Sequence, residues 1–244
     1  MGIIEQFPKK RVELPPAYQK IYEEHYLQNR EGLYKTTSLS QRLESWMHRK
    51  VCRDVKNGTD KATLEIGAGT LNHIPYEKHI STYDIVEPFK ELFENSARLQ
   101  HISNQYSDIS EVPNDCFYDR IISIAVFEHL QELPQLLALA ATHLNRGGVI
   151  RVAIPNEGTL LWKLGTMVTG WEFKKKYGLD YQVLMQYEHV NSAKEIEQVL
   201  NYFFNEVKAR SFGLGRYFSF YRFFECRDIK TNRVNSHLST FGTD

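Results

Sequence analysis

Two glycines and two carboxylates, spaced along two short apolar runs, are the residues of this sequence best suited to hold a nucleotide-like ligand. Gly67 and Gly69 follow the apolar run at 62–66, and glycine lets the backbone turn tightly beside a ligand. Glu65 stands inside this turn, and Glu87 closes the next apolar run. Glu87 lies about twenty residues beyond Gly67, a spacing at which a carboxylate can accept hydrogen bonds from both ribose hydroxyls.

The residues of this turn distinguish between two classes of ligand, a cationic nucleoside and a dinucleotide. A dinucleotide fingerprint needs a third glycine three positions after Gly69, and this chain has Asn72 there. Glu65 would repel a pyrophosphate, whereas it would attract an α-amino group or a sulfonium. The pattern therefore favours a ligand with a cationic end and a ribose, such as S-adenosylmethionine, over NAD.

Five motifs between residues 61 and 155 together resemble the class I S-adenosylmethionine-dependent methyltransferase family. In order, they are LEIGAGT at 64–70, DIVEP at 84–88, YSD at 106–108, YD at 118–119 with VFEHL at 126–130, and LNRGG at 144–148 with IP at 154–155. The chain departs from the family at Leu71, where many members have glycine, and at Ile124, where many have a polar residue. The resemblance implies methyl transfer from S-adenosylmethionine.

The same resemblance implies a role for each motif. Glu65 and the glycine turn would face the methionine portion of the cofactor, Glu87 the ribose and Asp108 the adenine amine, with the backbone at 125–127 under the adenosine. An acidic residue also suits the N-terminus of a helix beginning at Pro88, and Glu87 can serve both purposes. The cofactor residues expected on this basis are Glu65, Gly67, Ala68, Gly69, Thr70, Glu87, Pro88, Phe89, Asp108, Ile109, Ala125, Val126 and Phe127.

Two histidines are candidates for a general base. Methyl transfer from a sulfonium depends mainly on proximity and orientation, and a base is needed only for a hydroxyl or a protonated amine. His129 stands just past the fourth apolar run, at the edge where open α/β sheets hold their ligands. His189, near the end of the long segment at 156–190, could fold over the same edge. The alternatives are a capping or backbone-bonded role for His129 and a local hydrogen-bonding role for His189.

Aromatic and polar residues of the flanks are candidates for the acceptor side. Tyr18, Tyr22 and Tyr26 recur at helical spacing with His25 beside them, which predicts a helix with one aromatic face. That face could dock on the core or cover the acceptor as a lid. The acceptor contacts that we predict are Tyr22, His25 and Tyr26, together with Asn156 and Glu157 after the fifth strand. We expect no metal, since no ligating cluster is recognisable in the sequence.

The flanks also resemble bacterial methyltransferases associated with surface-polysaccharide biosynthesis. The phrases that carry this resemblance are YEEHY at 22–26, SWMH at 45–48, IPNEG at 154–158 and YEHVN at 187–191. The resemblance implies a sugar or a nucleotide-linked sugar as the acceptor.

From residue 61, apolar runs alternate with amphipathic stretches, which predicts repeated βα units. The fold class that we expect is α/β: a Rossmann-like, doubly wound, mostly parallel seven-stranded sheet with an antiparallel last strand, an N-terminal helical cap and a helical insertion after strand five. Strands are expected at 62–66, 82–86, 102–106, 120–126, 149–154, 206–212 and 217–226. Helices are expected from Ser38 or Ser40 until Asn57-Gly58, after 71, and at 88–99, 133–144 and 192–203. Ser192 is the expected cap of the last helix, with Glu195 completing a capping box. The expected division is a cap at 1–58, a cofactor domain at 59–228 with an acceptor-side insertion at 156–190, and a tail at 229–244.

The composition limits the partners. The 30 basic and 30 acidic residues leave no net field toward nucleic acid or an anionic membrane. The three widely spaced cysteines suit the reduced thiols of a cytoplasmic protein, and no run approaches the roughly 20 apolar residues of a membrane span. We expect a cytoplasmic enzyme with a small-molecule acceptor and no nucleic acid, for which a homodimer is allowed.

Three functions are compatible with these patterns. The first is methyl transfer to an oxygen or nitrogen atom of a small molecule. The second is a nicotinamide-dependent sugar oxidoreductase or epimerase on a related sheet, which Glu65 and Asn72 oppose. The third is a non-catalytic cofactor-binding protein of the same fold.

Overall fold

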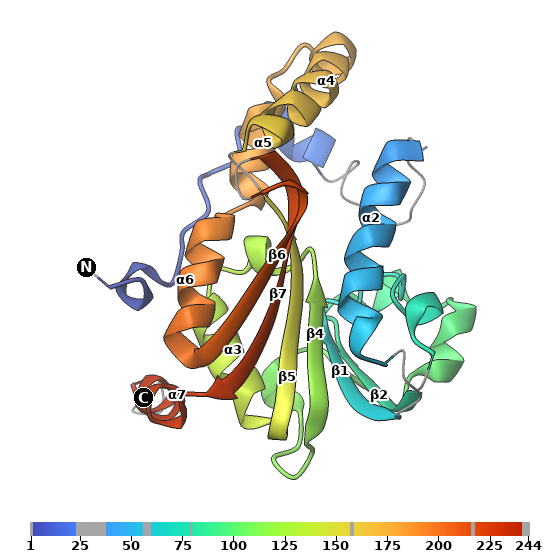
Figure 1. The fold of residues 1–244 in the computed structure, drawn as a ribbon. Coiled ribbons are helices and arrows are strands. Elements are labelled where there is room, and N and C mark those ends of the chain that lie inside the picture. Colours follow the sequence, from blue (N-terminus) through green and yellow to red (C-terminus); the bar gives the residue numbers. More distant parts are fainter. Residues whose placement is uncertain are drawn as a thin grey trace.

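One seven-stranded sheet forms the centre of the molecule (Figure 1). The computed structural model describes residues 2–22, 38–55, 60–78, 80–156, 159–215 and 218–240. The strand order is β3-β2-β1-β4-β5-β7-β6. The strands are β1 (Lys61–Ile66), β2 (Ile80–Val86), β3 (Asn104–Tyr106), β4 (Tyr118–Ile124), β5 (Leu144–Pro155), β6 (Phe204–Leu214) and β7 (Phe218–Ile229).

The strand directions confirm the predicted fold class. Strands β1 to β5 pair in parallel, whereas β7 runs antiparallel to both of its neighbours, β5 and β6. The last seven residues of β5 are all buried, which explains why all of them except Arg151 are apolar. Parallel order brings the carboxyl ends of β1, β2, β4 and β5 to one edge of the sheet, where the predicted motifs follow each strand.

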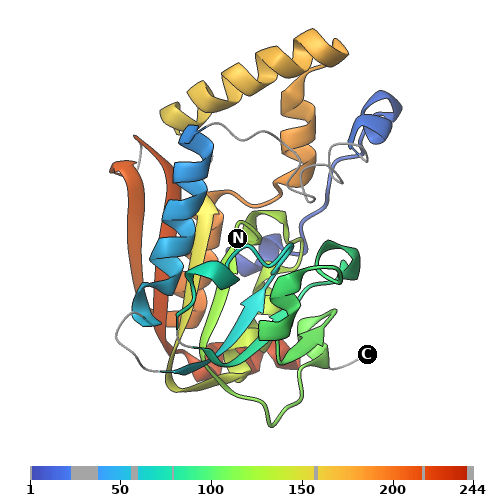
Figure 2. The ribbon, with the colours of Figure 1, turned by 90° about the vertical axis from the view of Figure 1, so that its right-hand side faces the viewer.

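Helices cover both faces of the sheet (Figures 1 and 2). On one face, α3 (Leu133–Thr142), α6 (Ala193–Phe203) and α7 (Thr231–Ser239) enclose a large apolar cluster with β1, β4 and β5. On the other face, α2 (Ser38–Val51) packs on β4, β5 and β7 around a second cluster that includes Met47, Val51 and Phe223. The α2 helix therefore forms one wall above the sheet, beside the carboxyl ends of its strands.

The predicted capping box at the start of α6 is present. The Ser192 hydroxyl accepts a hydrogen bond from the Glu195 backbone N–H at 3.3 Å, and the Ser192 N–H donates to the Glu195 carboxylate at 2.8 Å. This pair satisfies two donors that a helix N-terminus otherwise leaves without intrahelical partners.

Two segments differ from the sequence-based expectation. The helix expected at 88–99 is replaced by two short 3-10 turns, η4 (Lys90–Leu92) and η5 (Ala97–His101). Ser96 lies between them in an extended conformation and caps the second turn by accepting from the Arg98 N–H, so the segment restarts instead of continuing. The segment expected as a tail contains α7, which packs against α3 and α6.

The segment after β5 forms its own helical unit. Its helices are α4 (Leu160–Tyr177) and α5 (Tyr181–Glu188), which extend beyond the carboxyl edge of the sheet (Figure 1). Residues 16–22 are helical, and Tyr18 packs with Phe173 and Leu184 in a third apolar cluster. The Tyr18 hydroxyl accepts a hydrogen bond from the Asp180 N–H at 2.9 Å. The aromatic face of the N-terminal segment thus docks on the insertion.

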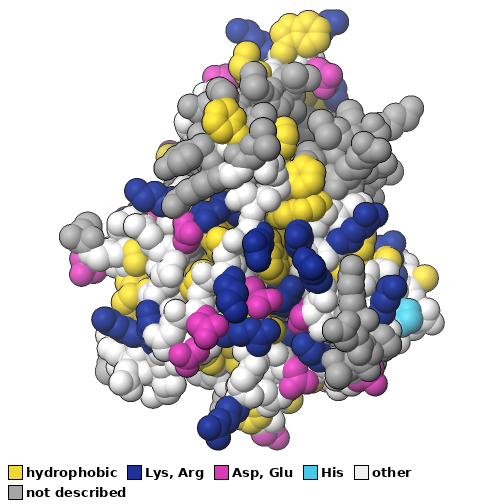
Figure 3. Space-filling model, viewed as in Figure 1, with side chains coloured by type: hydrophobic (Ala, Val, Ile, Leu, Met, Phe, Trp, Pro, Cys, Tyr) yellow, Lys and Arg dark blue, Asp and Glu magenta, His cyan; other side chains and the backbone are white. Residues whose placement is uncertain are grey.

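The face of β6 and β7 on the α2 side is charged (Figure 3). Glu206, Lys208 and Arg210 occupy every second position of β6. On β7, Arg227 lies opposite Glu206, and Glu225 lies opposite Lys208. The figure shows basic and acidic side chains mixed on this face, consistent with an overall charge of zero. Among the described helices, none is long and apolar enough to cross a membrane.

Candidate functional site

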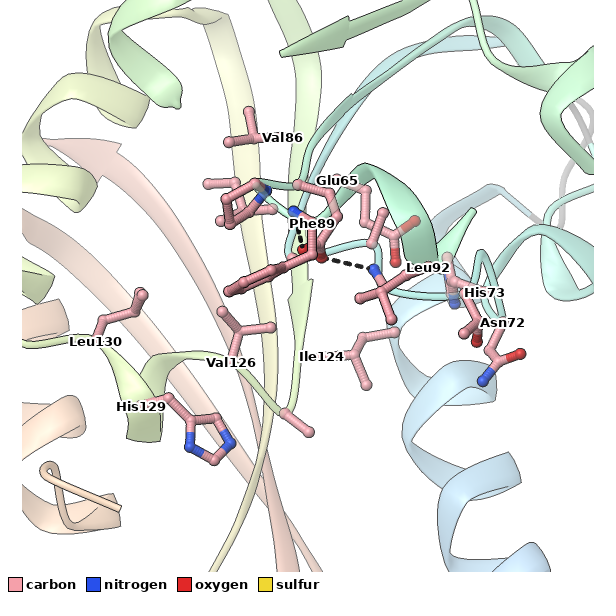
Figure 4. A pocket seen from close by; sticks show the side chains of 18 of the residues that line it. Glu65, Asn72, His73, Val86, Phe89, Leu92, Ile124, Val126, His129 and Leu130 are labelled. Atoms are coloured by element: carbon pink, nitrogen blue, oxygen red, sulfur yellow. Dashed lines mark hydrogen bonds between the residues drawn. The ribbon is translucent and has the colours of Figure 1, made fainter. Parts of the chain in front are cut away.

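A cavity of about 800 Å³ lies at the carboxyl edge of the sheet. It is lined by residues that follow β1, β2, β3 and β4, by the last turns of α2, and by Tyr221 of β7. The predicted cofactor residues Glu65, Gly67, Ala68, Gly69, Thr70, Glu87, Pro88, Phe89, Asp108, Ala125 and Val126 all contribute to its wall. Figure 4 shows the side chains from these loops facing one another across the cavity.

Two of the predicted residues turn their side chains away. Ile109 and Phe127 are 2% and 1% exposed and belong to the apolar cluster under α3. Only their backbones can contribute to a ligand site. An apolar residue in a motif is visible in sequence, but which face of the sheet it packs against is decided by the tertiary structure.

The turn after β1 requires glycine at its first position. Gly67 has φ 74°, and a Cβ atom there would lie 2.3 Å from Val126 Cγ2. The Gly67 N–H donates to the Val86 carbonyl at 2.8 Å, which joins the turn to the end of β2. Any larger residue at 67 would therefore push apart the loops after β1 and β4, which together form the floor of the cavity.

Leu71, where many family members have glycine, also has a left-handed backbone with φ 59°. Its side chain is fully buried in the cluster under α2. Burial of a leucine side chain contributes about 1.5–3 kcal/mol, which offsets the roughly 1–2 kcal/mol cost of this conformation. The departure from the family pattern therefore preserves the same turn.

Glu65 is a buried carboxyl at the wall of the cavity. It is 3% exposed and accepts a hydrogen bond from the Tyr83 hydroxyl at 2.8 Å. Burial raises its pKa from 4.5 to about 8, against the opposing effect of that hydrogen bond. A cationic ligand group beside Glu65 would favour the ionised form.

Glu87 closes the turn by hydrogen bonds to two backbone groups. Its Oε2 accepts from the Gly69 N–H at 2.8 Å, and its Oε1 accepts from the Phe89 N–H at 3.1 Å (Figure 4). Each carboxylate oxygen has a second lone pair, so the same group can still accept hydrogen bonds from ligand hydroxyls. Because no α-helix begins at Pro88, the helix-dipole explanation of this acidic residue does not apply.

Asp108 stands at the outer end of the cavity. It is exposed, and its Oδ1 accepts hydrogen bonds from the Ser110 N–H and hydroxyl at 2.9 and 2.6 Å. This fixes the carboxylate at the start of the turn Ile109–Glu111. On the opposite wall, Ala125 has φ 55°, which turns the backbone sharply after β4 and exposes it to the cavity.

His129 lies on the cavity wall, in the turn Phe127–His129 after β4. Its Nδ1 is 3.0 Å from the Glu188 carbonyl oxygen. Because a carbonyl only accepts, Nδ1 carries the proton, and Nε2 is the basic nitrogen of the neutral ring. The side chain is 35% exposed, so Nε2 can be reached from the cavity.

His189 packs edge-on against His129, with ring centroids 4.7 Å apart. Burial, together with His129, lowers the pKa of His189 to about 3, so it remains neutral at physiological pH. It is absent from the described wall of the cavity. The structure therefore favours His129 over His189 as a proton acceptor.

Glu128 is a residue of this site that the sequence analysis missed. It is 2% exposed, and burial raises its pKa to about 8, with Glu188 adding to the shift. Its Oε1 lies 3.8 Å from His129 Nε2. The motif that contains it pointed to the histidine, and only the fold shows that the preceding carboxyl lies behind the same wall.

The predicted acceptor residues fall in different places. Tyr22 lines the cavity and packs edge-on against Tyr187. Asn156 is 4% exposed and donates to the Ser219 hydroxyl at 2.6 Å, so it ties β5 to β7. His25, Tyr26 and Glu157 lie outside the described residues.

Comparison with known families decides what this cavity serves. A family model described as a methyltransferase domain matches residues 40–203. The chain belongs to this methyltransferase family. Its cofactor is accordingly S-adenosylmethionine, and the protein is a methyltransferase enzyme. No protein in a curated set matches the sequence.

Solved methyltransferases share the fold at low identity. A possible histamine N-methyltransferase from Thermotoga maritima has a TM-score of 0.56 at 15% identity, covering 87% of this chain and 98% of that one. N-methyltransferase NodS from Bradyrhizobium japonicum, solved with S-adenosylhomocysteine, has a TM-score of 0.54 at 13% identity over 80% and 89%. The plantazolicin methyltransferase BpumL, also solved with S-adenosylhomocysteine, has a TM-score of 0.57 at 12% identity over 93% and 94%.

The cavity of this methyltransferase fits its cofactor. A Cβ atom at Gly67 would clash with Val126 at the floor of the cavity, so glycine keeps this space open. The buried carboxyl of Glu65 is suited to the α-ammonium group of the cofactor. Glu87 has acceptor capacity for ribose hydroxyls beside the turn. Phe89, which is 42% exposed, and Val126 offer apolar surface on the way to Asp108. We assign these residues to the cofactor as a proposal.

Replacing Glu65 by glutamine should stabilise the cofactor-free methyltransferase at high pH while weakening cofactor binding. The folded protein keeps a proton on Glu65 between pH 4.5 and about 8 that the unfolded chain loses, so stability falls as pH rises through this window. Glutamine removes that loss and can still accept from Tyr83. We expect a gain of up to about 5 kcal/mol at pH 8.5, roughly 10–20 °C, and little change at pH 4.5.

Thermal unfolding at the two pH values measures the difference, and calorimetric titration with S-adenosylhomocysteine measures the affinity. The Glu94→Gln variant, an exposed glutamate of the segment after β2, is the control and should shift neither quantity. A stability difference that is equal at both pH values would show that Glu65 does not carry the raised pKa.

Proposed function

We propose that this protein transfers a methyl group to an oxygen or nitrogen atom of a small molecule, with a sugar or nucleotide-linked sugar of surface-polysaccharide biosynthesis as the acceptor. The observation that carries the small-molecule part is a second set of residues on the wall of the cofactor cavity. Arg11, Tyr22, Glu188 and Tyr221 line it without belonging to any cofactor motif, and His129, near the end of the fourth-strand motif, lines it beside them. An acceptor in contact with them shares one enclosed space with the cofactor.

These residues have the chemistry that a hydroxylated or aminated acceptor requires. Tyr22 and Tyr221 are aromatic surfaces, which suit the apolar face of a sugar ring. Glu188 supplies a carboxylate that can accept from hydroxyl or ammonium groups, and Arg11 is held by a 3.0 Å hydrogen bond to the His129 carbonyl. The two solved neighbours described as N-methyltransferases support nitrogen as an acceptor atom beside oxygen.

The protein's part in the reaction is to orient the acceptor and to take up its proton. S-adenosylmethionine supplies an activated methyl group on a sulfonium, which leaves as a neutral thioether. The loops after β1 and β4 hold the two reactants in one cavity, and such positioning accounts for most of the rate in this kind of displacement. His129 Nε2 receives the proton from the acceptor, while the Glu188 carbonyl keeps Nδ1 protonated.

The proposal extends to the partners, the location and the oligomeric state of the protein. A small-molecule acceptor and a neutral overall charge give no reason for a nucleic-acid partner. The three cysteines are free thiols, two of them buried, which suits a cytoplasmic location. A homodimer is compatible with the proposal but not required by it, because both sets of cavity residues come from one chain.

Radiolabelled methyl transfer from S-adenosylmethionine to a panel of nucleotide sugars, amino sugars and cell-wall extracts tests the function. We expect label in at least one sugar-containing product. Transfer only to acceptors without a sugar would overturn the acceptor class. Binding of S-adenosylhomocysteine with no transfer to any acceptor would instead support the alternative of a non-catalytic cofactor-binding protein.

A further inference from the structure

A line of buried polar side chains leads from the core to the cavity wall. Glu77 Oε2 accepts from Arg120 Nη1 at 2.7 Å, and Glu77 Oε1 accepts from His73 Nε2 at 2.5 Å. His73 Nδ1 lies 3.0 Å from His48 Nδ1. His48 and His73 are 6% and 1% exposed, and both reach the wall of the cavity. The methyl-transfer reaction described above uses none of these groups.

The hydrogen bonds fix where the protons are. A carboxylate only accepts, so His73 Nε2 carries a proton and donates it to Glu77. Burial lowers the pKa of His73 to about 4, so the ring is neutral and its Nδ1 is an acceptor. His48 Nδ1 must then donate to His73. The remaining nitrogen of His48, Nε2, is therefore the one that takes no part in this chain of hydrogen bonds.

The position of His48 suits an interaction with an anionic group. It lies in the last turn of α2, where the helix dipole favours a cation. Its Nε2 is 3.8 Å from Glu44 Oε1, and the interaction with His48 lowers the pKa of Glu44 even though burial opposes this. Tyr76 stacks on the imidazole at 4.8 Å and holds its plane.

His48 is also placed at one particular end of the cavity. His73 and Asn72 lie beside α2, on the side of Glu65, whereas His129 and Leu130 lie at the opposite side (Figure 4). Among the described residues of the wall, the basic side chains are Arg11, His48, His73 and His129. Arg11 is bound to the His129 backbone, and His73 is neutral. Among the basic side chains of the described wall, His48 is therefore the candidate partner for an anionic group on the side of Glu65.

We propose that His48, oriented by His73 and Glu77, is the cationic group that receives the carboxylate of the cofactor's methionine portion. Glu65 and His48 then form a matched pair, with a carboxyl for the α-ammonium and an imidazolium for the α-carboxylate. Glu44 balances the charge of His48 when no cofactor is bound. This assignment rests on the proposed placement of the methionine portion beside Glu65, and it is independent of the acceptor.

A metal site does not explain these side chains. In the described part of the chain, no group of three or more histidine, cysteine, aspartate or glutamate residues is arranged to hold a metal ion. Glu77, His73 and His48 form a chain of hydrogen bonds, and both ring nitrogens of His73 are engaged in it. Nε2 of His48 takes no part in this chain; it lies 3.8 Å from Glu44 Oε1, and both residues line the cavity.

Calorimetric binding of two ligands tests the proposal. S-adenosylhomocysteine carries the carboxylate, and its decarboxylated analogue keeps the amine but lacks it. The native protein should bind the analogue about 10- to 100-fold more weakly than S-adenosylhomocysteine. His48→Ala and His48→Gln should bind S-adenosylhomocysteine with a similar loss, and they should bind the two ligands almost equally. Equal loss for both ligands, or no loss, would overturn the role of His48.

Two further measurements keep this outcome interpretable. Binding of the decarboxylated analogue at native affinity shows that each variant is folded. His143→Ala removes a buried histidine that contacts the Cys116 carbonyl outside the cavity, and it should keep the native preference for the carboxylate. If the native protein binds neither ligand, the methyltransferase assignment and this proposal fail together, whereas binding without carboxylate preference overturns this proposal alone.

Discussion

Replacing His129 by alanine should lower the rate of methyl transfer by about 100-fold or more while cofactor affinity stays within about twofold. The expectation follows from the orientation of the ring. Its Nδ1 proton is engaged by the Glu188 carbonyl, which leaves Nε2 as the basic nitrogen of a ring on the cavity wall. Removing the ring removes the proton acceptor and leaves the glycine turn and Glu87 intact.

The pH profile of the rate separates a base from a structural residue. In the native protein, the rate should fall as pH drops and His129 becomes protonated, because an imidazolium cannot accept the acceptor's proton. The His129→Ala variant should lose this acidic limb, and its residual rate should rise with pH as hydroxide takes over the deprotonation. Single-turnover measurement with S-adenosylmethionine already bound gives the rate without a contribution from cofactor binding.

His189→Phe is the matched control for the His129 variant. His189 contacts the same ring, but its pKa of about 3 makes it a much weaker base than an ordinary imidazole. We expect this variant to keep the acidic limb and to lose only a few-fold in rate through a shift of His129. A native rate in His129→Ala would assign His129 to holding Glu188 and Arg11 in place.

Local sequence signals account for most of the fold. Strands β1, β4 and β5 are buried on both faces, so their mainly apolar stretches are visible in the sequence without any knowledge of their neighbours. The capping box of α6 lies within four residues, and the sequence predicted both of its members. The antiparallel β7 could be predicted because glycines separate two aromatic-rich stretches of similar length.

The segment after β2 shows where such signals fail. Its helical spacing predicted one helix, but Ser96 can bond to the backbone two residues later, and that local bond competes with helix continuation. The position of the turn after β2 still matched the prediction, because Glu87 and the end of the strand are fixed by the sheet. Boundaries set by competition between local bonds are harder to predict than those set by burial.

The site was predictable wherever its residues share a motif. Glu65, Gly67 and Glu87 follow adjacent parallel strands, and the parallel order brings them to one edge. His48 and His73 are 25 residues apart and on different elements, and only the packing of α2 on the sheet brings them together. The one local signal of that network was the spacing of His73 and Glu77, four residues apart. Pairs at this spacing are common in proteins and usually have no functional role.

Replacing Glu87 by alanine should weaken the binding of S-adenosylhomocysteine by about 1–3 kcal/mol, or roughly 5- to 150-fold. Two effects add in the same direction. The ribose hydroxyls lose their proposed acceptor, and the Gly69 and Phe89 N–H groups lose the carboxylate that holds the turn at 2.8 and 3.1 Å. Isothermal calorimetry measures the affinity, and thermal unfolding without ligand reports the contribution of the turn alone.

A conservative variant separates these two effects. Glutamine at position 87 keeps an oxygen that can accept from the Gly69 N–H, so Glu87→Gln should preserve the unfolding temperature more closely than Glu87→Ala. Its affinity should still fall, because an amide has only one accepting oxygen to divide between the turn and the ribose. Glu91→Ala, at an exposed glutamate of η4, should leave both quantities unchanged. Native affinity in Glu87→Ala would remove this carboxylate from the cofactor site and restrict it to bracing the turn, and the ribose would then have to be bound by backbone groups of the loops after β1 and β2.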